Sequence, residues 1–64
     1  MNAFHKAFKI MRKRGKLARL GDYLTFTTTS IPHDEFDALY AALIHSGFKP
    51  KVYGSNGKLI IQFK

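Results

Sequence analysis

The chain has 64 residues and a formal net charge of +7. A chain of this length buries only about 60% of the surface that its unfolded form exposes, which excludes a second domain and predicts modest stability. The absence of cysteine excludes disulfides and thiolate zinc sites, whereas an apolar content of 45% is enough for a folded core.

The positive charge is concentrated in the N-terminal segment. Residues 1–20 contain seven of the eleven Lys and Arg residues and no acid. These seven are Lys6, Lys9, Arg12, Lys13, Arg14, Lys16 and Arg19. The other four lysines are balanced by the four acids, so residues 21–64 carry no net charge. Charge gathered on one segment attracts an anionic partner more strongly than the same charge spread over a surface.

Residues 2–14 are predicted to form an amphipathic helix. Apolar side chains recur at i, i+3, i+4 and i+7, the spacing that places them on one helical face. They are Phe4, Ala7, Phe8 and Met11. Most of the cations share the opposite arc, and only Arg14 falls on the apolar side. Like charges four residues apart on this arc repel, which favours an anionic partner over a merely solvated helix face.

Gly15 leaves the end of this helix open, because glycine disfavours a helix interior and is common just past a helix end. If the helix continues to residue 20, Lys16 and Arg19 join the cationic arc. If it ends near Arg14, residues 16–20 form a short strand that turns at Gly21 and Asp22, and the basic patch splits in two.

Residues 23–29 are predicted to be a strand, because they are rich in aromatic and β-branched side chains. Pro32 then suits the first turn of a second helix. The strongest helical stripe in the chain follows, and we expect it to form the core. Its members are Phe36, Leu39, Tyr40, Leu43 and Ile44. Gly47 followed by Phe48 is typical of a helix C-terminal cap.

The C-terminal segment is predicted to be a β-hairpin turning at Asn56 and Gly57. This register pairs Val52 with Ile61 and Tyr53 with Ile60. The fold class is therefore α+β in a single domain, 1–64: a basic amphipathic helix, a strand or short hairpin, a core helix, and a C-terminal hairpin.

The basic arc is the main candidate site, and its most direct interpretation is a module that binds nucleic-acid phosphates with little sequence specificity. The alternative is a protein–protein interaction module or inhibitor, of the type that viruses encode, that binds an acidic surface of a larger intracellular partner. No apolar run approaches the about 20 residues that span a bilayer, and an anionic membrane surface is a less favoured partner of the basic helix than nucleic acid or an acidic protein.

A secondary candidate site is the sheet face that carries two tyrosines and two lysines. Aromatic side chains on an open sheet can stack on unpaired bases. The residues are Tyr23, Lys51, Tyr53 and Lys58. However, the N-terminal helix needs an apolar surface to cover, so we expect these tyrosines to pack beneath it rather than to bind a ligand.

No pattern in the chain indicates an enzyme, a cofactor or a metal site. The histidines His5, His33 and His45 are far apart, and the hydroxyls of residues 27–30 have no base tied to them. The glycines near residue 55 precede a strand rather than a helix, unlike a phosphate-binding loop. A cysteine-free fold fits a reducing compartment, and we expect a cytoplasmic protein.

Overall fold

The computed structural model describes residues 3–64, which form two helices and a four-stranded antiparallel sheet. The elements are α1 (Ala3–Arg14), β1 (Lys16–Leu20), β2 (Tyr23–Thr28), α2 (His33–His45), β3 (Lys51–Ser55) and β4 (Lys58–Phe63). The predicted α+β class is confirmed, and the strand or short hairpin of the prediction is a hairpin of β1 and β2. The predicted start of the first helix at Asn2 lies outside the described residues. Neither described helix is long and apolar enough to cross a membrane.

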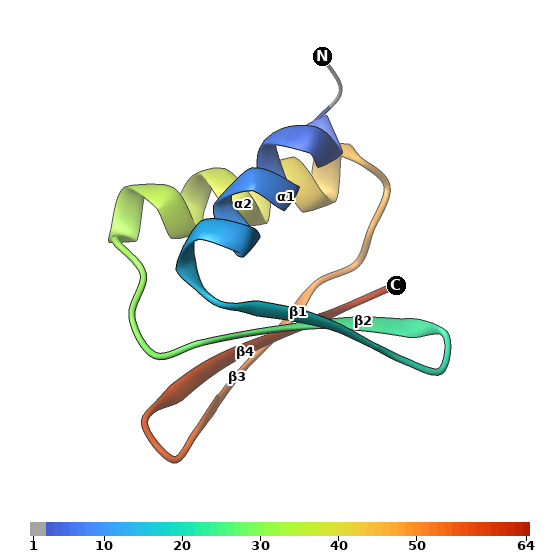
Figure 1. Ribbon diagram of the computed structural model, residues 1–64. Helices are drawn as coiled ribbons and strands as arrows, with labels where there is room; N and C mark the ends of the chain where they lie inside the picture. The colour runs from blue at the N-terminus through green and yellow to red at the C-terminus, as the bar shows by residue number, and fades with distance from the viewer. Residues whose placement is uncertain (1–2) are drawn as a thin grey trace.

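Both helices lie on one face of the sheet, whose strand order is β1-β2-β4-β3 (Figure 1). The helices pack against each other, and α1 follows directly into the edge strand β1. The core between the layers is formed by both helices and the two central strands, and Leu17 of the edge strand β1 packs against it. Its fully buried members are Ala7, Met11, Phe26, Leu39, Leu43, Ile61 and Phe63. The expectation that α1 covers the tyrosine-bearing face is therefore wrong, because its apolar stripe packs beside α2 instead.

The first helix ends at Arg14, and Gly15 begins the turn into β1. A side chain at Gly15 would overlap the backbone carbonyl oxygen of Thr27 and press on the ring of Phe26. Only glycine fits at position 15 without a shift of neighbouring atoms, since the backbone of the turn lies directly against β2. Of the two predicted alternatives, the shorter helix followed by a strand is the correct one.

The second helix is close to the prediction, with two differences. Pro32 has an extended backbone and stands one residue before the helix, at its N-cap position. Leu39 and Leu43 are buried as expected, but Ile44 is 50% exposed, and Ala42 takes its place in the core. The buried face is turned this way because α2 packs against α1 as well as the sheet.

Two turns agree with the sequence signals: the one that closes α2 and the one that joins the two strands of the C-terminal hairpin. Gly47 has a φ of 91° and closes α2, and the amide of Phe48 donates to the carbonyl of Leu43 at 3.0 Å. Asn56 and Gly57 both have positive φ, as the central residues of a type I′ turn require. The register is the one predicted, with Val52 opposite Ile61 and Tyr53 opposite Ile60.

Candidate nucleic-acid interface

Four cations form the surface of α1 that points away from the domain. We call this surface the α1 arc: Lys6, Lys9, Arg12 and Lys13, all of which are exposed. Opposite them, Ala7 and Met11 are fully buried, and Phe4 packs on Phe48 with their ring centroids 5.4 Å apart. The apolar side of α1 is thus held in the core, so the four charges are presented on a fixed element.

Arg14 was predicted as part of the basic site, but the structure pairs it with an acid of α2. Its Nε and Nη2 donate to the two carboxylate oxygens of Glu35, at 2.8 and 2.6 Å. The two side chains are only 30% and 25% exposed. These hydrogen bonds, together with the opposite charges, lower the pKa of Glu35 and raise that of Arg14. Arg14 therefore joins the helices and contributes little free charge to the surface.

Lys13, at the same end of the α1 arc, is weakly drawn toward this pair. Its Nζ lies 3.9 Å from the Glu35 carboxylate, while its side chain stays 65% exposed. An exposed contact of this length adds little stability. Lys13 thus remains accessible to a partner.

Lys16 and Arg19 do not belong to the helical arc, because both lie on β1. The β1–β2 register places Lys16 opposite Thr27 and Arg19 opposite Leu24, on opposite faces of the sheet. Arg19 turns back to the adjacent turn, with its Nε 3.3 Å from the carbonyl oxygen of Gly21. The basic patch is therefore split at Gly15, as the shorter-helix alternative implies.

Arg12 lies beside an aromatic ring on the same surface. Its guanidinium carbon is 5.7 Å from the centroid of the half-buried Phe8 ring. Such cation–π contacts are weak at exposed sites. The α1 arc thus combines one arginine guanidinium, which lies beside an aromatic ring, with three lysine ammonium groups.

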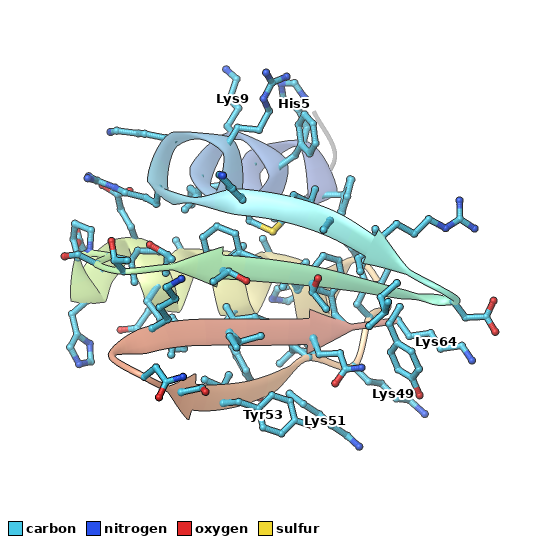
Figure 2. All side chains as sticks on the ribbon, turned by 60° about the horizontal axis from the view of Figure 1, so that its bottom comes forward. His5, Lys9, Lys49, Lys51, Tyr53 and Lys64 are labelled. Atoms are coloured by element: carbon cyan, nitrogen blue, oxygen red, sulfur yellow. The ribbon has the colours of Figure 1, made fainter. Side chains whose placement is uncertain are left out.

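The second sheet face is not covered by either helix, which corrects the expectation for the tyrosines. Tyr23 and Tyr53 are 42% and 46% exposed. Figure 2 looks onto this face and shows Tyr53 and Lys51 side by side at the bottom of the view, with Lys9 of the α1 arc at the top. Lys58 is also exposed and lies opposite Ser55 at the turn end of the hairpin. All four residues of the secondary site therefore remain available.

Two further lysines join this face that were not predicted as site residues. Lys49 and Lys64 line one hollow with Tyr23 and Lys51. The alternation of β4 carries one residue beyond Phe63, so the outward position of Lys64 could have been read from the sequence. The position of Lys49 could not, because it depends on the path of the chain between α2 and β3.

A comparison of the chain with models of known protein families finds no match, and a comparison with curated protein sequences finds none either. The function is therefore inferred from the charged surfaces alone.

Proposed function

We propose that the protein is a non-enzymatic binding module that engages nucleic-acid phosphates through the α1 arc. The observation that carries this proposal is the set of four exposed cations on a helix whose other side is buried in the core. No acid occurs among the first 20 residues to neutralise them. The four cations repel one another, and an anionic partner would relieve this repulsion.

The dimensions of the α1 arc suit a phosphate backbone. From Lys6 to Lys13 the helix rises by roughly 10 Å, at about 1.5 Å per residue. Duplex DNA presents about six phosphate charges over the same length of its axis. Lysine and arginine bind phosphates without reading bases, so we expect affinity for many sequences and little discrimination among them.

Charge reversal on the α1 arc tests the proposal. The variant K6E/K9E removes two cations for which the structure shows no intramolecular partner among the described residues. Two unit charges 4 Å apart in water attract by about 1 kcal/mol, so losing two contacts alone predicts a roughly 30-fold loss of affinity, and repulsion by the two new carboxylates enlarges it. We expect this loss for every duplex sequence alike, measured by fluorescence anisotropy of a labelled duplex.

The matched control is K51E/K64E, which changes the net charge equally but on the opposite side of the molecule. It should retain most of the duplex affinity. Glutamate and lysine are similarly good helix formers, so K6E/K9E should remain folded by circular dichroism. Unchanged duplex binding by folded K6E/K9E would show that the α1 arc is not the site.

A second candidate function is a protein-interaction module or inhibitor that uses the same surface against an acidic protein. The observation that favours it is the contact between Arg12 and Phe8, because protein interfaces concentrate their binding energy in arginine and aromatic side chains. Affinity capture after nuclease treatment separates the two functions. A stoichiometric acidic partner that survives nuclease and is lost with R12A would favour this candidate. Either function is proposed for the cytoplasm, since the chain contains no cysteine.

A further inference from the structure

The sheet surface turned away from both helices forms a second basic surface, which we call the open face. The strand registers place on it the outward residues of all four strands. They are Lys16, Ala18 and Leu20 of β1, Tyr23, Thr25 and Thr27 of β2, Lys51, Tyr53 and Ser55 of β3, and Lys58, Ile60 and Gln62 of β4. The four strands contain no acidic residue. The open face therefore combines cations, aromatic rings and neutral hydrogen-bonding groups.

Tyr53 is the aromatic residue on the open face whose ring is most available for stacking. It sits on the edge strand β3, opposite the half-buried Ile60, and is 46% exposed. Within residues 3–64, no aromatic ring packs on it and no cation lies over it. Tyr23 differs, because the Lys64 ammonium is 5.4 Å from its ring centroid. A flat partner can thus stack on Tyr53 without first displacing a neighbour.

Three lysines surround a hollow at one end of the open face. The hollow has a volume of about 400 Å³ and is lined by Lys49, Lys51 and Lys64 together with Tyr23, Gly47 and Gln62. In Figure 2 the three lysines lie near one another, and Tyr53 is adjacent to Lys51. The nearest acid is Asp22, whose carboxylate is 3.9 Å from the Lys64 ammonium and 83% exposed, so it neutralises this cluster only in part.

We propose that the open face binds an unpaired segment of nucleic acid, with a base stacked on Tyr53 and a backbone phosphate held in the hollow by Lys49, Lys51 and Lys64. This inference goes beyond the proposed function, because it assigns a second site on a different surface and a different class of nucleic acid. A sheet face carrying an exposed aromatic ring beside cations suits single strands, because only unpaired bases expose a face for stacking. The bases of a duplex are already stacked on one another, so a duplex gains nothing from Tyr53.

The experiment compares single strands with a duplex for three variants. The probes are labelled oligo(dT), oligo(U) and a mixed-sequence duplex, and the readout is fluorescence anisotropy. We expect Y53A to weaken binding of both single strands by about 5- to 150-fold, the range found when a stacking residue is replaced by alanine. Y53F keeps the ring and should bind them as the wild type does. K51E/K64E should also lose single-strand affinity.

The outcomes separate this inference from the proposed function. Equal single-strand affinities for wild type, Y53A and Y53F would overturn the inference, whatever K6E/K9E does to duplex binding. A loss with Y53A that Y53F restores supports it, even if duplex binding fails and the α1 arc is thereby excluded. A loss in both Tyr53 variants, with unchanged unfolding midpoints, would overturn stacking as the mode of binding. A preference for oligo(U) or oligo(dT) would assign the open face to RNA or DNA.

Discussion

At the scale of single residues, Gly15 decides where the positive charge is placed. It ends α1 after Arg14 and sends Lys16 and Arg19 into a strand. The glycine itself signals a helix end in the sequence. The physical reason for a glycine at this position could not be predicted. The Thr27 carbonyl leaves no room for a side chain there, and it belongs to a different element that approaches Gly15 only in the folded protein.

We predict that Gly15→Ala destabilises the domain by about 1–3 kcal/mol, the usual cost of forcing extra atoms into a packed site. Thr27 pairs with Lys16 on one side and Ile60 on the other, so its backbone cannot easily move aside. Urea unfolding followed by circular dichroism measures the loss. Gly54→Ala is the matched control, because nothing lies within 4 Å of an added side chain at that exposed strand position. Equal unfolding midpoints for the two variants would contradict this account of Gly15.

At the scale of the elements, the placement of α1 was the feature that sequence reasoning missed. Its apolar stripe was correctly predicted, but a stripe does not say which surface it covers. Tyr23, Tyr53 and Ile60 offered an apolar sheet face, whereas the real partner is α2, joined to α1 through the Arg14–Glu35 pair. The buried Thr28 hydroxyl also donates to the carbonyl of Arg14 at 2.7 Å, which ties the end of α1 to β2.

The Arg14–Glu35 pair predicts a pH dependence of stability. Folding lowers the pKa of Glu35, so the stabilisation is complete above the ordinary glutamate pKa of about 4.3 and is lost as the pH falls through the lowered value. We therefore expect Glu35→Gln to be less stable than the wild type at neutral pH. The difference in urea midpoint should disappear in acid. A difference independent of pH would show that charge on Glu35 does not hold the helices together.

At the scale of the whole molecule, the protein presents two basic surfaces on different sides rather than one continuous patch. The α1 arc lies on a helix, whereas the open face is a sheet surface with exposed aromatic rings. The sequence predicted the element order, both C-terminal turns and the hairpin register, because those features depend on local backbone chemistry. It did not predict that the open face is uncovered or that Lys49 and Lys64 meet there, because these depend on how the helices share one side of the sheet.

The central claim, that the α1 arc binds nucleic-acid phosphates, is tested most directly by the salt dependence of duplex affinity. About four phosphate contacts predict that log K falls with log salt at a slope near −3.6, from about −0.9 per contact. K6E/K9E removes two of these contacts and should therefore reduce the magnitude of this slope by half, to near −1.8. A slope close to zero, or no complex even at low salt, would contradict the claim.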